Sequence, residues 1–275
     1  MLKNLLKYDF KAVLKYWWIA ALSCFALSFV GGGCITILNT DRELPGLVYP
    51  LTIIGLILVI ISFVVFSVLS VIFVYVRFYK NFFTDEGYLT FTLPVKRSQL
   101  LNAKLIMSVG TMLLTGVVCI INALIIICIG FSDVIFSLNF WEEFRTMIDT
   151  IVNEVGFYLV IYSVETLVII LLSVIFSTLF IFCCITFASI ITKKAKVLVA
   201  IGIYYVANGI FSFVGQIFYL FGISSLTNWI SALPMDRIYT LIALILLGLI
   251  SFFGMLCALL YTLQYWMIDR KLNLD

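Results

Sequence analysis

The amino-acid sequence predicts an all-α integral membrane protein with six transmembrane helices. Of its 275 residues, 64% are hydrophobic and only 11% are charged, and the mean hydropathy is +1.21. A soluble domain usually has about a quarter of its residues charged. Long uncharged stretches and an unequal distribution of Lys and Arg between the loops point to the same class. A soluble enzyme, a nucleic-acid-binding protein and a disordered scaffold are therefore excluded.

Six stretches of the chain contain no Asp, Glu, Lys or Arg and are long enough to cross a bilayer. A helix needs about 20 apolar residues to span a hydrocarbon core of about 30 Å. With the flanking residues that continue the same helices, the predicted spans cover about residues 17–38, 47–83, 99–131, 157–192, 197–221 and 238–268. We expect residues 1–275 to form a single transmembrane domain.

The basic residues concentrate in alternate loops. Of the 17 Lys and Arg residues, 14 lie in residues 1–16, 77–104, 193–196 and 269–275, and three lie on the opposite side of the predicted spans. Cytoplasmic loops of membrane proteins carry an excess of Lys and Arg. The distribution therefore predicts that both termini face the cytoplasm, which agrees with the even number of spans.

Residues 1–16 are expected to form an amphipathic helix that lies along the inner leaflet. Apolar side chains share one face of a helical wheel, although Asp9 projects near that face. The opposite face carries three lysines, Lys7, Lys11 and Lys15. These lysines would contact anionic headgroups before the chain turns into the first span at Trp17. The alternative is an ordinary positively charged flank that only sets the topology.

The second span is predicted to be longer than a bilayer requires. No proline after position 50 interrupts residues 47–83, so a helix there would extend about 55 Å at 1.5 Å per residue. The excess projects into the cytoplasm, where a short helix of about residues 85–93 follows and Pro94 ends it. Its exposed apolar edge indicates a docking surface for a partner. The alternative is that its aromatic side chains fold back on the inner leaflet as an anchor.

The loop after this span resembles the motif of a known family. Residues 86–97 read EGYLTFTLPVKR, and Lys104 heads the next span. This run resembles the E-x-G-T-[LI]-x-x-L-x-x-P-[VI]-[ST]-R loop of type 2 ATP-binding-cassette (ABC-2) permeases, in the versions of Firmicutes-type bacteria. Tyr88 stands where Thr is commoner, and Lys96 stands where Ser or Thr is commoner. The predicted topology of the remaining chain agrees with that family.

The resemblance implies that residues 85–93 form a coupling helix that docks on a separate ABC ATPase (nucleotide-binding) subunit. The implied docking residues are Asp85, Glu86, Gly87, Tyr88, Leu89, Phe91, Leu93 and Pro94. A second permease chain, identical or homologous, would complete the transporter. ATP and Mg would bind to the ATPase, and this chain would bind no cofactor. The implied location is the bacterial inner membrane.

The composition offers no evident catalytic or metal site. The chain has no histidine, the residue that most often serves as general base and metal ligand. It also has no Gly-Lys pair for a phosphate-binding loop. Its seven cysteines lack the C-x-x-C spacing and lie in apolar stretches, so they are expected to be buried hydrophobic side chains. An enzyme embedded in the membrane is therefore disfavoured.

Three further segments carry expectations about the outer half of the molecule. Residues 222–235 are polar and are too short to span, so they are expected to form a re-entrant pair of short helices before the last span. Residues 140–153 are amphipathic and are expected to lie along the outer surface. Glu165 is expected at the outer interface, in preference to the alternative of a transport-active carboxylate within the membrane.

The fifth span carries polar and aromatic side chains at helical spacing. They are Tyr204, Tyr205, Asn208, Phe211, Ser212 and Gln216. Such a stripe usually makes hydrogen bonds between helices. The alternative is that it lines a cavity where two permease chains meet.

Together these features favour a permease subunit of an ATP-driven exporter. The expected cargo is amphipathic or hydrophobic: a peptide, a lipid-like molecule or a drug. One alternative is a membrane immunity or sensor module that binds an antimicrobial peptide without moving it. Another is a secondary transporter, which would require several buried ionisable groups or helices broken near the midplane.

Overall fold

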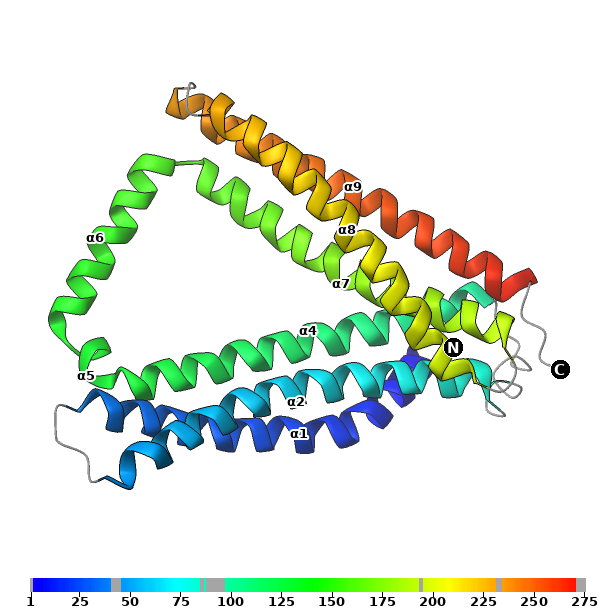
Figure 1. The fold of residues 1–275 in the computed structure, drawn as a ribbon, viewed down its shortest axis with the longest axis horizontal. Helices are drawn as coiled ribbons and strands as arrows, with labels where there is room; N and C mark the ends of the chain where they lie inside the picture. Colours follow the sequence, from blue (N-terminus) through cyan, green and yellow to red (C-terminus); the bar gives the residue numbers. More distant parts are fainter. Residues whose placement is uncertain are drawn as a thin grey trace. The chain divides into compact units, whose positions relative to one another are not determined.

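The computed structural model describes residues 2–40, 46–84, 87, 97–192, 195–230 and 234–270, and within these ranges it contains helices and no strands (Figure 1). The six long helices are α1 (Leu2–Asn39), α2 (Val48–Phe83), α4 (Arg97–Gly130), α7 (Tyr158–Ile191), α8 (Lys196–Ile230) and α9 (Met235–Arg270). Two further helices, α5 (Ser132–Ile135) and α6 (Leu138–Val155), connect α4 to α7.

All six long helices are long and apolar enough to cross a membrane, which confirms the predicted fold class. The candidate span within α8 is Lys196–Ile217, and the one within α1 is Leu6–Asn39. Large aliphatic and aromatic side chains are exposed along every one of these helices. The exposure of so much apolar surface to water would be energetically unfavourable, whereas contact of the same surface with lipid chains is favourable. The chain is therefore a multi-pass helical membrane protein.

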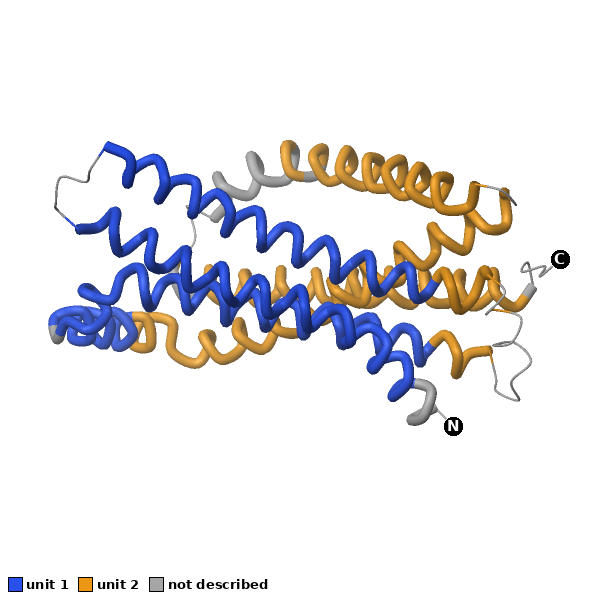
Figure 2. The backbone as a smooth tube through the Cα atoms, turned by 90° about the horizontal axis from the view of Figure 1, so that it is seen from below, with its two compact units in different colours: residues 1–78, 102–150 blue, residues 79–101, 151–275 orange. Residues whose placement is uncertain are grey.

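The chain divides into two compact units (Figure 2). Unit 1 comprises Met1–Phe78 and Asn102–Thr150, and unit 2 comprises Tyr79–Leu101 and Ile151–Asp275. Unit 1 thus contains α1 and most of α2 and α4, and unit 2 contains α7, α8 and α9. The description of residues 1–275 as a single domain stays a prediction.

In unit 1, α1 and α4 run parallel to each other, with α2 antiparallel to both. Trp17 on α1 donates from Nε1 to Thr115 on α4 at 3.0 Å, and its ring packs on Phe66 of α2. Further along, Ser28 donates to Asn122 Oδ1 at 2.8 Å. Hydrogen bonds between spanning helices compensate for the absence of a hydrophobic driving force in lipid. They fix which faces of α1 and α4 meet.

Glycines on α1 allow its neighbours to approach closely. A Cβ atom at Gly31 would lie 2.8 Å from Val59 of α2, and one at Gly32 would lie 2.6 Å from Ile129 of α4. Both distances are shorter than a van der Waals contact, so a larger residue would push the helices apart. Small residues at helix interfaces have this role in membrane proteins generally.

In unit 2, α7 packs against both α8 and α9. The Tyr162 hydroxyl on α7 donates to the backbone oxygen of Tyr239 on α9 at 2.8 Å. Near the other end of α7, Gln264 Nε2 donates to Thr186 Oγ1 at 2.7 Å. These two contacts show that α7 and α9 run parallel to each other. A cluster of aromatic rings joins α7 to α8 and α9, formed by Phe176, Phe180, Tyr204, Phe211 and Phe253.

The structure does not confirm two expectations about helix boundaries. The chain does not turn at Trp17, because α1 is one uninterrupted helix from Leu2 to Asn39. Residues 222–230 do not form a separate re-entrant helix, because they continue α8 to Ile230. No proline occurs between positions 196 and 233. The backbone hydrogen bonds of the helix can therefore continue where the side chains become polar. Residues 231–233 lie outside the described ranges.

The amphipathic segment predicted at residues 140–153 is confirmed as a helix, α6. The hydroxyl of Ser137 accepts a hydrogen bond from the Phe140 backbone N–H at 3.3 Å, which satisfies one of the free donors at the start of the helix. Gly156 follows the helix with a φ of 55°. A residue in this left-handed conformation commonly ends a helix, and glycine adopts it without steric strain.

Candidate functional site

The predicted coupling helix lies outside the described residues except at one position. Its residues Asp85, Glu86, Tyr88, Leu89, Phe91, Leu93 and Pro94 are not described. Gly87 is helical, and its backbone N–H donates to the Thr84 carbonyl oxygen at 2.7 Å. A Cβ atom there would lie only 2.8 Å from the carbonyl oxygen of Phe82. Since a backbone oxygen cannot move aside easily, this tight turn after α2 requires a glycine.

The downstream end of the same loop is attached to the end of α9. Arg97, the first residue of α4, donates from Nη1 to the Asp269 carboxylate at 3.0 Å and to the Asp269 backbone oxygen at 2.7 Å. Both side chains are largely exposed, so the ion pair itself contributes little stability. The bond to the carbonyl also satisfies a free acceptor at the C-terminal end of a helix, where a positive charge is favourable.

A buried ion cluster lies at the end of unit 1 where α1 begins, and the sequence did not reveal it. Asp9 accepts hydrogen bonds from Lys104 Nζ and, at 3.4 Å, from Arg77 Nε. Asp9 and Lys104 are 4% and 2% exposed. The three residues come from α1, α2 and α4, so the cluster joins all three helices of the unit. Its one sequence signal was the position of Asp9 near the apolar face of the first helix.

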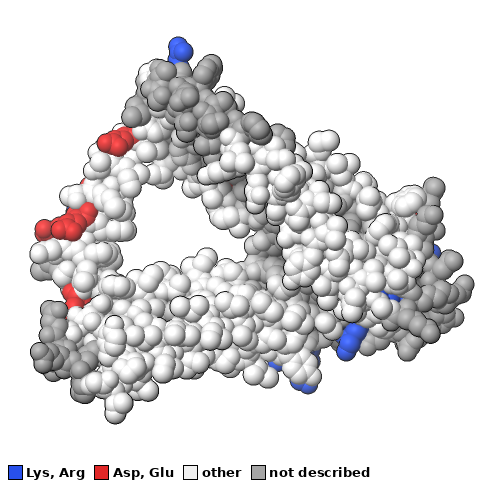
Figure 3. All heavy atoms as spheres, viewed as in Figure 1, with Lys and Arg blue, Asp and Glu red and all other residues white. Residues whose placement is uncertain are grey.

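In unit 1, Arg77 and Lys104 lie at one end of α4, whereas the described acidic residues other than Asp9 follow its other end, together with Arg145. Asp9, Arg77 and Lys104 mark one end of α4, whereas α5 and α6 follow the other end. Figure 3 shows Asp and Glu gathered over α6. The acids on α5 and α6 are Asp133, Glu142, Glu143, Asp149 and Glu154. This separation is what the positive-inside distribution of the sequence predicts for a helix that crosses a membrane.

The stripe on α8 is divided between two environments. Tyr204 and Phe211 pack against α7, with ring centroids 5.7 Å from that of Phe180 in each case. The remaining residues of the stripe are exposed on unit 2: Tyr205, Asn208, Ser212 and Gln216. A polar face that is exposed on a membrane-spanning helix lies unfavourably against lipid. The exposed half of the stripe is therefore a candidate contact for a second chain or for cargo.

Glu165 is buried within unit 2, two helical turns after the start of α7. It is 9% exposed, and its Oε2 atom has no hydrogen-bond partner among the described residues. Tyr162 lies one turn before it on the same helix face. The position at the outer interface that the sequence leads us to expect stays a prediction. A buried carboxyl group without a partner in a spanning helix marks a functional candidate.

All seven cysteines carry free thiols. Four of them, Cys24, Cys183, Cys184 and Cys257, are buried, as expected for hydrophobic side chains. Cys34 and Cys119 are only partly buried and Cys128 is exposed, which departs from that expectation. The Cys183 thiol also donates to the Leu260 backbone oxygen at 3.5 Å. The described residues contain no group of three or more His, Cys, Asp or Glu side chains placed to hold a metal ion.

Comparison of the chain with protein-family models, with curated proteins and with solved structures finds no match. The class of multi-pass helical membrane protein therefore rests on the chain's own sequence and fold.

Proposed function

We propose that this chain is the permease subunit of an ATP-driven ABC exporter in a bacterial inner membrane. It would move an amphipathic or hydrophobic cargo, such as a peptide, a lipid-like molecule or a drug. ATP and Mg would bind to a separate ATPase subunit, and both termini of the permease would face the cytoplasm. A second permease chain, identical or homologous, would complete the membrane part.

The observation that carries this proposal is the length of the helices on either side of residues 84–97. With 36 residues in α2 and 34 in α4, each helix would extend about 50 Å, which is about 20 Å more than the hydrocarbon core. A loop between two such helices can be held well outside the lipid. The tight turn at Gly87 and the attachment of Arg97 to Asp269 support a loop whose two ends are held in place.

This geometry suits the transmission of force from an ATPase. A rigid helix that is pushed at its projecting end moves as a lever, because packed helices respond as units and do not deform continuously. The contacts of unit 1 would pass a displacement of α2 to its neighbours through the Asp9 cluster. The exposed polar half of the α8 stripe is a suitable surface for the second permease chain or for cargo.

The proposal is tested by reconstituting the chain with its ATPase in lipid vesicles. Replacing Leu89 and Leu93 together by Asp should abolish recovery of the ATPase with the permease and should abolish ATP-dependent cargo movement. The matched control replaces Met147 and Val152 of α6, two exposed residues far along the chain from the loop, and should behave as the wild type. Undiminished co-purification with the Leu89 and Leu93 variant would contradict the docking role.

A secondary transporter is the second candidate, and Glu165 is the observation that favours it. A buried carboxyl group with an unpartnered oxygen can carry a proton across a membrane. In sealed vesicles without ATPase, cargo movement driven by a proton gradient and lost in Glu165→Gln would establish that candidate. ATP hydrolysis that cargo stimulates without any cargo accumulation would instead indicate an immunity or sensor module.

A further inference from the structure

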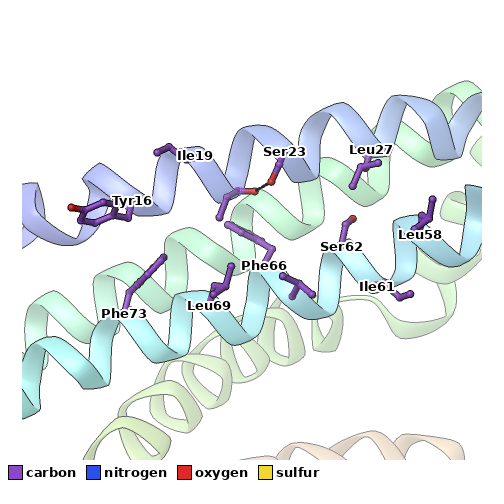
Figure 4. A pocket seen from close by; sticks show the side chains of 12 residues that line it. Tyr16, Ile19, Ser23, Leu27, Leu58, Ile61, Ser62, Phe66, Leu69 and Phe73 are labelled. Carbon is purple, nitrogen blue, oxygen red and sulfur yellow. Dashed lines mark hydrogen bonds between the residues drawn. The ribbon is translucent and has the colours of Figure 1, made fainter.

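A groove with a volume of about 510 Å³ runs between α1 and α2 in unit 1 (Figure 4). It extends from Tyr16 to Leu27 on α1 and from Phe73 to Leu58 on α2. At 1.5 Å per residue these lengths are about 16 Å and about 22 Å. Phe66, which is fully buried, forms part of its floor. The groove is thus long, narrow and parallel to the helices.

The groove is open on one side, and its walls are almost wholly apolar. Ile19, Leu58 and Val65 on its rims are about half exposed or more. Its hydroxyl groups besides that of Tyr16 belong to Ser23 and Ser62, and each donates to a backbone oxygen of its own helix, at 2.8 and 2.7 Å. Their protons are therefore not available to a ligand. The part of an occupant that fills this groove must be hydrocarbon.

One end of the groove is closed by aromatic rings and flanked by positive charge. The rings of Tyr16 and Phe73 lie 6.3 Å apart across it. The Lys15 ammonium lies 5.7 Å from the centre of the Tyr16 ring, and Lys15 shares a helix face with Ile19, one turn away on the rim. Arg77 lies one turn beyond Phe73 on α2, with its side chain 31% exposed.

The ion cluster of Asp9, Arg77 and Lys104 lies beside this end of the groove. Arg77 and Lys104 carry positive charges, and Asp9 carries a negative charge between them. The helices supply no charge at the other end, because residues 16–40 and 46–76 contain no Asp, Glu, Lys or Arg. The groove therefore differs along its length: its walls are apolar, and the basic side chains of Lys15 and Arg77 lie at one end.

We propose that this groove binds one acyl chain of an anionic phospholipid, with the lipid phosphate against Lys15 and the exposed part of Arg77. Lateral entry from the bilayer fits the open side of the groove. Polybasic groups next to a spanning segment attract anionic lipids by about 1 kcal/mol for each Lys or Arg. The structure thus assigns to unit 1 a specific lipid site, independent of what the protein transports.

A helix from a second copy of the chain fits the groove less well. It would have to bring a carboxylate to the basic end. In unit 1, Asp9 is already held in the ion cluster, and the described acids of α5 and α6 follow the opposite end of α4. A lipid phosphate supplies a negative charge to Lys15 and Arg77 without this conflict.

Native mass spectrometry of the full chain tests the proposal. The protein is released from bilayers that contain equal amounts of phosphatidylglycerol and phosphatidylcholine, and the retained lipid is counted. The wild type should keep one phosphatidylglycerol molecule for each chain. Ser23→Trp fills the groove and should lower this retention roughly tenfold, equivalent to about 1.4 kcal/mol. Leu22→Trp, at an exposed neighbouring residue that does not line the groove, should retain lipid as the wild type does.

A second pair of variants tests the charged end of the site. Lys15→Gln should reduce the preference for phosphatidylglycerol over phosphatidylcholine, whereas Lys11→Gln, one turn farther from the groove, should change it less. Melting temperatures in detergent establish that each variant is folded. Equal lipid retention in folded Ser23→Trp and wild type would overturn the proposal. So would loss of a dimer, without loss of lipid, in Ser23→Trp, because that result would place a second copy in the groove.

Discussion

Lys104 of α4 donates to the carboxylate of Asp9 on α1, and both side chains are almost completely buried. The two residues are 95 positions apart in the sequence, and their pairing holds the start of α4 against the first turns of α1. Arg77 of α2 completes the cluster with its more exposed guanidinium group. A buried charge is tolerated only when it is paired. The three-helix packing of unit 1 therefore depends on this contact at one of its ends.

Removing the Lys104 charge is expected to destabilise the protein strongly. Lys104→Met removes the bond from Lys104 to Asp9 and keeps the longer one from Arg77, and loss of one partner of a buried pair costs about 3–5 kcal/mol. Combining Lys104→Met with Asp9→Leu should recover most of that loss, since no buried charge then lacks its partner. Thermal unfolding in detergent micelles measures both variants. A double variant that is no more stable than Lys104→Met would contradict this account.

A matched substitution separates burial from charge. Arg77→Met removes the partly exposed partner of Asp9 and leaves the bond from Lys104 intact. Because solvent already screens the Arg77 charge, we expect a smaller loss of stability than in Lys104→Met.

Gly156 is expected to tolerate Asn better than Ala. Its φ of 55° lies in the left-handed region, and no other atom lies within 4 Å of the position that a Cβ atom would take. Backbone strain is therefore the main cost of any substitution there, about 1–2 kcal/mol for an ordinary residue and less for Asn. Comparison of the melting temperatures of Gly156→Ala and Gly156→Asn measures this difference. Equal melting temperatures would show that the turn after α6 adapts to either residue.

Much of the fold could be predicted from the sequence because lipid imposes a simple length rule. The predicted span at residues 47–83 corresponds to α2 at Val48–Phe83, and the one at 157–192 corresponds to α7 at Tyr158–Ile191. Charged residues mark the boundaries of the hydrocarbon core of the membrane. In these two cases the helix also ends close to those residues.

The two expected boundaries that the structure does not confirm share one cause. In α1 and α8 the apolar segment ends, but the helix continues into polar residues, because a helix breaks at residues such as proline and not at a change of solvent. The candidate sites were harder to predict for a different reason. The pairing of Arg97 with Asp269 joins residues 172 positions apart, and no local pattern in the sequence specifies such a contact.

Glu165→Gln is expected to leave the stability of the protein unchanged or to raise it. The Oε2 atom has no partner among the described residues, so this oxygen gains no compensating bond for its loss of water. An amide of the same shape avoids the cost of a buried charge. Thermal unfolding of the wild type and of Glu165→Gln measures the difference in stability. A marked loss of stability in Glu165→Gln would show that an ionised Glu165 has a stabilising partner in the native protein.

The contact between Gln264 and Thr186 predicts an asymmetry between two single substitutions. Gln264 is fully buried, and it donates from Nε2 to the Thr186 hydroxyl, while its Oε1 atom has no partner among the described residues. Thr186→Val removes the acceptor and leaves the whole amide of Gln264 buried without a bond. Gln264→Met removes the amide and keeps a side chain of similar length.

Leaving a buried polar group unpaired costs about 1–3 kcal/mol, whereas replacing it by an apolar group of similar shape is nearly neutral. Thr186→Val should therefore be the more destabilising of the two, although it changes fewer atoms. Thermal unfolding of both variants, with Thr262→Val as a control at an exposed threonine of α9 that bonds only to its own helix, measures the difference. If Gln264→Met instead lowers the melting temperature more than Thr186→Val does, the hydrogen bond to Thr186 stabilises the protein by more than the unpaired Oε1 atom destabilises it.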